Sequence, residues 1–127
     1  MKIVGAIARY LLGLMFLVFG LNMFFQFMKG QMPGGLAGQF AGVLFASHYF
    51  YVVGALMVIS AILFLVNRYV GLGLTLLAPV LFNILIFHIL MNPAGIGPGA
   101  FATLLWLLVA WQHRRVFERL FAAHLEE

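Results

Sequence analysis

Apolar residues are gathered into four long runs, which short segments rich in polar residues, glycine or proline separate. The runs cover residues 3–28, 49–66, 70–91 and 101–112. A helix needs about 20 apolar residues to cross a bilayer, and lipid offers the backbone no hydrogen-bond partner outside a helix or a closed barrel. The two-residue alternation of a barrel strand does not occur in these runs. The pattern therefore predicts an all-α membrane protein, with a bundle of four transmembrane helices.

A shorter apolar stretch lies at residues 36–46, between the first two runs. Leu36, Phe40, Val43 and Leu44 recur there at helical spacing. The stretch is too short to span a bilayer, so it predicts a short interfacial helix at the outer surface. Residues 113–127 form a polar tail, and residues 1–127 together are predicted to be one transmembrane domain.

The positive charges decide the expected orientation. Four spans bring the N-terminus, the loop at residues 67–69 and the C-terminal tail to one side of the membrane. That side holds six of the 7 Lys and Arg residues, namely Lys2, Arg9, Arg68, Arg114, Arg115 and Arg119. Lys29 alone is predicted on the other side. Because cytoplasmic loops carry the excess of positive charge, both termini are predicted to be cytoplasmic.

The composition excludes several classes of protein. Hydrophobic residues make up 65% of the chain and charged residues 8%, against about 45–50% and about 25% in soluble domains. So few charges cannot give a soluble enzyme or a nucleic-acid-binding domain its polar surface. The chain has no cysteine, which excludes disulfides and thiolate ligands within it. No catalytic motif is present, so the chain is not expected to be an enzyme on its own.

Small residues recur along one face of the first run. Ala6, Gly13 and Gly20 follow each other at intervals of seven residues, and small residues let helix backbones approach closely in lipid. We expect this face to pack against a neighbouring helix. Arg9 falls on the same face, and two roles are open for it. It could reach the inner head groups as an anchor, or donate to a buried carbonyl or cofactor oxygen.

Three further residues in the runs are expected to have structural roles. The hydroxyls of Ser60 and Thr75 should bond backbone carbonyls. Pro79 has no N–H to donate, so it should bend its helix and free a carbonyl one turn earlier, close to Thr75.

Five polar side chains form the candidate binding site. Asn22 and Gln26 share one face of the first run, Asn83 and His88 lie in the outer half of the third, and His48 precedes the second. The predicted topology places all five in the outer leaflet, where polar groups are costly and mark functional sites by default. Their amide and imidazole N–H groups could donate hydrogen bonds to a quinone carbonyl or a lipid head group. Alternatively, the five side chains bond only one another across helices.

Other ligands fit these residues less well. Two histidines on different helices raise the possibility of bis-imidazole haem ligation, but the two differ in predicted depth. A metal site is not predicted, because neither carboxylate nor cysteine accompanies the histidines. No Asp or Glu lies in a predicted span, so a carboxylate proton relay or a cation pathway is not expected. A small transporter is the most distant alternative.

Two tracts carry a resemblance to known proteins. They are ARYLLGLMFLVFGLN at residues 8–22 and PVLFNILIFH at residues 79–88. Together with the four-span length, they resemble the DoxX-like family of small bacterial membrane proteins. The resemblance implies a four-helix bundle in the bacterial cytoplasmic (inner) membrane with both termini inside. Some members are subunits of quinone-linked sulfur oxidation and others join oxidoreductase complexes for oxidative stress, which implies a redox-associated, often accessory role. The resemblance assigns no catalytic residues, and without cysteine this chain has no thiol relay like that of related disulfide-reductase bundles.

Two functional hypotheses follow. In the first, the chain is a non-catalytic accessory subunit of a larger membrane complex, whose partners are lipids and other membrane subunits, or further copies of itself. In the second, it binds a quinone or a lipid itself, through the five outer polar residues, as a component of a membrane oxidoreductase. The apolar character of each run all round, and the lack of an acid–base pair, favour the first hypothesis.

Overall fold

The chain folds into helices. The computed structural model describes residues 2–27 and 33–124, and these ranges contain no strand. In chain order the helices are α1 (Lys2–Phe25), α2 (Gly35–Ala46), α3 (Tyr49–Val66), α4 (Val70–Met91), the short 3₁₀ helix η1 (Pro93–Gly95), α5 (Gly97–Gln112) and α6 (Arg114–Leu120). The predicted all-α class is confirmed for the described residues.

The helix bounds follow local backbone chemistry. α3 and α4 cover two of the predicted runs, because Asn67 and Tyr69 between them adopt left-handed φ values of 57° and 55°, which a continuous helix cannot contain. α5 begins at Gly97, ahead of the predicted start at residue 101, because Pro98 suits the first turn of a helix. α6 lies in the segment predicted only as a polar tail. The predicted end of the first run, at residue 28, lies outside the described residues, as does Lys29.

Three of the helices, α1, α3 and α4, are long and apolar enough to cross a membrane. α5 and α2 are shorter apolar helices of 16 and 12 residues. At 1.5 Å per residue α5 is about 24 Å long, against about 30 Å for the hydrocarbon core of a bilayer. Membrane-spanning length is thus shown for three of the four predicted spans.

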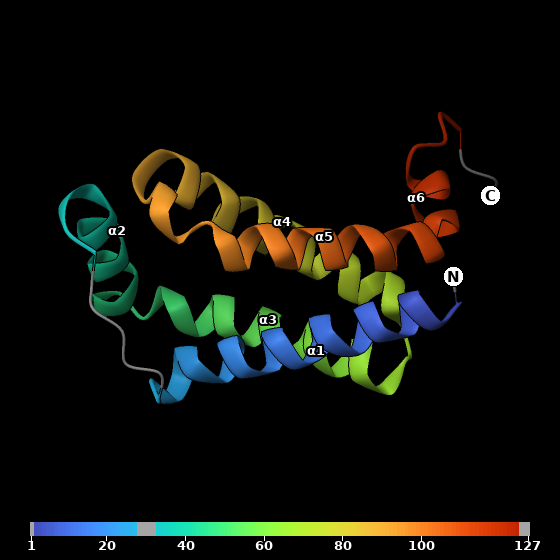
Figure 1. Cartoon of the computed structure of the whole chain (residues 1–127), viewed down its shortest axis with the longest axis horizontal. Helices are drawn as coiled ribbons and strands as arrows, with labels where there is room; N and C mark the ends of the chain where they lie inside the picture. Colours follow the sequence, from blue (N-terminus) through green and yellow to red (C-terminus); the bar gives the residue numbers. More distant parts are fainter. Residues whose placement is uncertain (1, 28–32, 125–127) are drawn as a thin grey trace.

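α1, α3, α4 and α5 lie side by side along the long axis of the molecule (Figure 1). α1 packs against α3 and α5, and α4 packs against the same two helices, so α1 and α4 lie diagonally across the bundle. α2 covers one end, in contact with α3 and α4. α6 lies at the other end, near the N-terminus.

The core between the four helices consists of large apolar side chains. Each helix contributes to it, and the fully or almost fully buried members include Leu12, Phe16, Phe64, Leu74, Leu77, Leu105 and Val109. The outward faces are apolar as well, so burial of these residues reflects shape and not polarity. In lipid such packing stabilises the bundle through van der Waals contact rather than exclusion of water.

α1 and α3 approach each other closely through glycines. A Cβ placed on Gly20 would lie 2.9 Å from the Cβ of Met57 and 3.1 Å from the carbonyl oxygen of Gly54. A Cβ placed on Gly54 would lie 3.0 Å from the carbonyl oxygen of Gly20. The predicted small-residue face is confirmed at Gly13 and Gly20, which are buried against α3, whereas Ala6 is half-buried.

Leucine at these glycines should destabilise the bundle. We expect Gly20→Leu to lower the free energy of unfolding by about 3 kcal/mol, the upper end of the usual cost of overpacking, because the backbone at Gly54 cannot move aside. Gly13→Leu should cost less, since the flexible side chain of Leu65 takes up part of the strain. Leu17→Ala, at a half-buried position, should have the smallest effect. Thermal unfolding in detergent measures all three.

Gly42→Leu is the matched control, because a Cβ on this glycine of α2 would meet open space. Equal losses of stability for Gly20→Leu and Gly42→Leu would contradict the close contact between α1 and α3.

Candidate functional site

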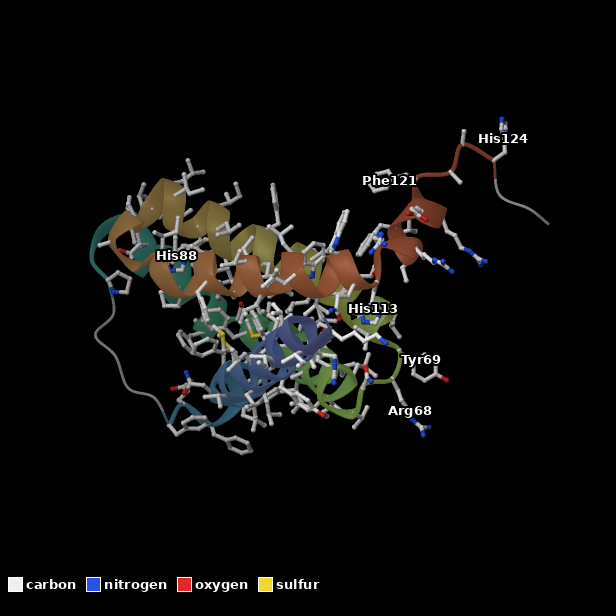
Figure 2. All side chains as sticks on the ribbon, turned by 45° about the vertical axis from the view of Figure 1, so that its right-hand side comes forward. Arg68, Tyr69, His88, His113, Phe121 and His124 are labelled. Carbon is white, nitrogen blue, oxygen red and sulfur yellow. The ribbon has the colours of Figure 1, made fainter. Side chains whose placement is uncertain are left out.

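The five predicted site residues lie in the half of the molecule that α2 covers. Asn22 is in the last turn of α1, and Gln26 follows that helix with a left-handed φ of 51°. His48 precedes α3 with a φ of 61°. Asn83 and His88 belong to the second half of α4. Figure 2 shows His88 at the end of the bundle opposite to His113 and His124.

His48 belongs to an aromatic group that joins α1 to α3. Its ring stacks with that of Tyr51, with centroids 5.3 Å apart, and the Tyr51 ring stacks with that of Phe24 at 5.4 Å. His48 and Tyr51 are exposed, and Phe24 is exposed at the end of α1. Gln26 lies close by in the chain, and its backbone N–H donates to the carbonyl of Asn22 at 2.8 Å. Asn22, Gln26 and His48 therefore lie in one region, where α1 ends and α3 begins.

Asn83 and His88 use their polar groups within α4. The amide of Asn83 donates to the carbonyl of Pro79 at 2.7 Å. The Nδ1 atom of His88 lies 2.8 Å from the carbonyl oxygen of Ile84. Because a carbonyl oxygen only accepts, Nδ1 carries the proton, and a neutral His88 presents Nε2 as an acceptor.

The surroundings of His88 come from η1 and α2. A Cβ placed on Gly95 would lie 3.3 Å from Nε2 of His88 and 3.1 Å from the amide nitrogen of Asn92, so the imidazole packs beside the 3₁₀ turn. The ring of Phe87 contacts that of His88 edge-on at 5.1 Å and stacks with that of Phe40 of α2 at 5.6 Å.

The predicted site thus divides into two groups of residues. Asn22, Gln26 and His48 lie on α1 and at the start of α3, whereas Asn83 and His88 lie on α4, diagonally across from α1. One of the two alternatives for these residues was bonding to one another across helices. Asn83 and His88 bond instead to carbonyls of α4 itself.

The threonine hydroxyls of the bundle helices follow the same rule, and the serine hydroxyl of α3 is an exception. Thr75 and Thr103 donate to the carbonyls of Gly71 and Gly99 at 2.9 and 2.8 Å, so the prediction for Thr75 is confirmed. The prediction for Ser60 is wrong, because its buried hydroxyl has no hydrogen-bond partner among the described residues.

The region around Pro79 provides a hydrogen bond between α4 and α5. Pro79 has no N–H for the carbonyl of Thr75, and next to that carbonyl the indole of Trp106 donates to the carbonyl of Leu74 at 3.1 Å. A side chain of α5 therefore bonds to the α4 backbone in the turn before the proline.

Arg9 takes the buried role of the two that the sequence left open. It is 8% exposed, and its guanidinium donates to the carbonyl of Phe64 near the end of α3. The C-terminal end of a helix carries unpaired carbonyls and a partial negative charge, which a cation stabilises. The ring of Tyr10 lies below the guanidinium, 4.4 Å from its carbon to the ring centroid. The acceptor is a backbone carbonyl of α3, so Arg9 fastens α1 to α3.

His113, between α5 and α6, lies at the same end of the bundle and is half-buried. Burial, and after it the positive charge of Arg9, lower the pKa of the His113 imidazole below its ordinary value of 6.5. Neither effect was predicted from the sequence, because both depend on how α5 and α1 pack.

Two surface hollows lie at this end as well. A groove of about 640 Å³ between α4 and α6, which we call the α4–α6 groove, is lined by residues that include Tyr69, Leu72, Thr75, Val116, Arg119 and Leu120. A second hollow, of about 370 Å³, is lined by Lys2, Trp111, Gln112 and Arg114. The sequence analysis did not predict this groove, although the tail mixes basic with large apolar residues. Within the described residues, no group of three or more His, Cys, Asp or Glu could hold a metal ion.

Comparison of this chain with protein-family models, with curated proteins and with solved structures gave no match.

The lowered pKa of His113 predicts a pH-dependent stability. Below about pH 6.5 the unfolded chain takes up a proton at this histidine and the folded chain does not until the pH reaches the lower, folded pKa. The unfolded state therefore binds more protons in that window, and the free energy of unfolding falls as the pH drops through it. Thermal unfolding in detergent from about pH 7.5 to about pH 5.5, a range in which histidine ordinarily titrates, should show this loss of stability.

His113→Gln should flatten the pH dependence, whereas His124→Gln, at an exposed position of the tail, should leave it unchanged. An unaltered pH profile in His113→Gln would contradict the assignment.

Proposed function

We propose that this chain is a DoxX-like membrane protein with four spans and both termini in the cytoplasm, which acts as a non-catalytic accessory subunit of a larger, redox-associated complex in the bacterial cytoplasmic membrane. The two tracts that resemble the family lie in α1 and α4, the helices that α3 and α5 connect into one bundle.

The position of α5 supports the fourth span. α5 packs beside both α1 and α4, which have spanning length, so it should pass through the same layer of lipid. The C-terminal end of α5 carries a pair of residues typical of a membrane interface. The guanidinium of Arg114 lies 4.7 Å from the ring centroid of Trp111 and donates to the Trp111 carbonyl at 2.9 Å. A span this short is accommodated by local thinning of the bilayer or by flanking side chains that reach the interface.

The distribution of charge supports the orientation. The ends of α3 and α5 and the start of α1 lie at one end of the bundle, together with Lys2, Arg68 and the three arginines of α6. Arg9 bonds to the end of α3 at the same end. An excess of positive charge marks the cytoplasmic side.

One observation carries the accessory role: four polar side chains of α4 and α5 turn back to carbonyls of their own helix, and the outward faces of the bundle are left apolar. Thr75, Asn83, His88 and Thr103 all bond in this way. Large apolar side chains are exposed along α1 and α5, among them Ile3, Ile7, Leu11, Leu14, Val18, Phe101, Leu104, Leu107 and Trp111. Such faces suit lipid and the apolar faces of other membrane helices, and they present no acid–base pair.

The second function, binding of a quinone or lipid by the outer polar residues, is favoured by His88 alone. With Nδ1–H engaged by Ile84, the free Nε2 would accept a hydrogen bond from a hydroxyl, such as that of a reduced quinone or of a lipid head group, rather than donate one to a quinone carbonyl. Asn83 has one of its two amide N–H groups engaged by the carbonyl of Pro79, which leaves the second N–H as a donor and the amide oxygen as an acceptor.

The topology has a direct test, because a chain without cysteine allows single-cysteine labelling. Cysteines at Gly34 and Gly97, where a Cβ meets open space, should react with a membrane-impermeant maleimide added from outside. Gly34 precedes α2 and Gly97 begins α5, and both lie at the end of the bundle away from Lys2 and α6. A cysteine at Ala123 should react only after the cells are opened. Labelling of Ala123→Cys from outside would overturn the orientation, and labelling of all three from the same side would overturn the four spans.

The accessory role predicts a protein neighbour on one face of the bundle. A photo-reactive amino acid at Leu14, Ile59, Phe82 or Leu104, which point outward from α1, α3, α4 and α5, should cross-link in cells to the same membrane protein from one or two of these positions. The remaining positions, facing lipid, serve as controls. Cross-linking from none of them, or only to further copies of this chain, would contradict a role as a subunit of a larger complex.

The second function can be tested separately on the chain purified in mild detergent. If the outer residues bind a quinone or lipid, His88→Leu should lose the molecule that co-purifies. Stability should change little, because the Ile84 carbonyl keeps its ordinary helix bond from the His88 backbone N–H. Mass spectrometry of the extracted small molecules and thermal unfolding give both readouts, and equal retention by the two proteins would exclude His88 as a ligand-binding residue.

A further inference from the structure

α6 is an amphipathic helix. Projected at about 100° per residue, its residues separate into a polar side and an apolar side, which are Arg114, Arg115, Glu118 and Arg119 on one and Val116, Phe117, Leu120 and the following Phe121 on the other. The polar residues are all exposed. Phe121, next to the helix, is 86% exposed although it is aromatic, and Figure 2 shows it projecting from the bundle.

Packing contacts hold α6 against the bundle. The ring of Phe117 lies 5.7 Å from that of Trp106 of α5, between centroids. Val116 packs on Gly71 of α4, where an added Cβ would lie 2.8 Å from the valine Cγ2. α6 therefore contacts α5 through Phe117 and α4 through Val116, and the α4–α6 groove is the space that this arrangement leaves open.

The α4–α6 groove combines an apolar wall with one basic side chain. Leu72, Val116 and Leu120 line it together with Arg119, and Tyr69 stands at its rim. Its volume of about 640 Å³ falls within the about 300–1,000 Å³ of small-molecule sites. Arg119 lies where the basic side of α6 meets the apolar side, so a ligand in the groove would contact a cation and hydrocarbon together.

Positive charge predominates near the groove, with three arginines against one glutamate on α6. Arg114 and Arg115 neighbour Arg119 on α6, and Glu118 is the only acidic residue of the chain before residue 126. Basic pockets between membrane helices attract anionic lipid head groups, and the planar guanidinium of arginine can pair with a phosphate through two hydrogen bonds. Tyrosine, as at position 69, is a residue typical of the head-group region.

We propose that the α4–α6 groove binds one anionic phospholipid from the leaflet at this end of the bundle. One acyl chain lies along Leu72, Val116 and Leu120, and the phosphate pairs with the guanidinium of Arg119. The bound lipid would link α6 to the membrane surface and to α4. This site is separate from the outer polar residues, and it rests on the proposed membrane location but not on which side the termini face.

The test uses the full chain, purified in detergent and incubated with phosphatidylglycerol, with bound lipid counted by native mass spectrometry. The unaltered chain should retain one phosphatidylglycerol in preference to phosphatidylcholine with the same acyl chains. Arg119→Gln should raise the Kd for phosphatidylglycerol about tenfold, as expected for loss of a charged hydrogen-bonding partner. Arg115→Gln is the matched control, because it removes the same charge from the same helix outside the groove lining, and it should retain the lipid.

A second variant tests the apolar wall without changing charge. Leu72→Trp, at an exposed position, should fill the groove and reduce retention while thermal unfolding stays unchanged. If Arg119→Gln and Arg115→Gln lose equal amounts of phosphatidylglycerol, general attraction between charges explains the binding and the proposed pairing with Arg119 is wrong. If Leu72→Trp retains all of its phosphatidylglycerol, the lipid does not bind in the groove. Displacement of phosphatidylglycerol by inorganic phosphate would identify an anion site rather than a lipid site. Retention in detergent is independent of orientation and of partner subunits, so a failure here is distinguishable from a failure of the proposed function.

Discussion

The crossing of α1 and α3 at Gly20 and Gly54 is the contact on which the rest of the bundle depends. At this point the two backbones approach so closely that a Cβ on either glycine would lie 3.0–3.1 Å from the carbonyl oxygen of the other. The close approach continues to Gly13 and ends where Arg9 donates to the Phe64 carbonyl. The α1–α3 pair therefore has a small-residue contact in the middle and a charged hydrogen bond at one end. α5 packs on one member of this pair and α4 on the other, which closes the ring of four helices.

The shortage of hydrogen-bond partners in lipid explains where the polar side chains of the bundle point. An amide, hydroxyl or imidazole group in a span needs a partner inside the protein, and the nearest acceptor is the carbonyl four residues earlier in its own helix. Thr75, Asn83, His88 and Thr103 all take this local partner. Local bonding satisfies each group without a ligand and without a second helix. It also orients what remains of each group, so a neutral His88 is left with an acceptor nitrogen, and Asn83 with one N–H donor and an acceptor oxygen.

The two ends of the bundle differ in chemical character. The end under α2 carries aromatic contacts that include His48 and His88, with rings from α1, α2, α3 and α4. The opposite end carries the basic residues, His113 with its lowered pKa, and the two hollows. Arg9 connects these properties, because its buried charge both fastens the end of α3 and opposes protonation of His113. Among the described residues, the basic side chains therefore lie at the end where α1 begins, and the aromatic contacts of His48 and His88 at the other.

The sequence by itself determined the helical class, the extents of α3 and α4 and the small-residue face of α1, because hydropathy, turn-forming residues and residue size act locally along the chain. It also predicted that five polar residues, Asn22, Gln26, His48, Asn83 and His88, form a site, but not which partners their side chains have. Tertiary structure decided that Asn22 and His88 lie on diagonal helices, that Arg9 reaches α3, and that Val116 of the tail docks on Gly71 to form the α4–α6 groove. These outcomes depend on which helices become neighbours. In a chain whose helices are apolar on every side, periodicity carries almost no information about which faces meet, so packing shape makes that choice.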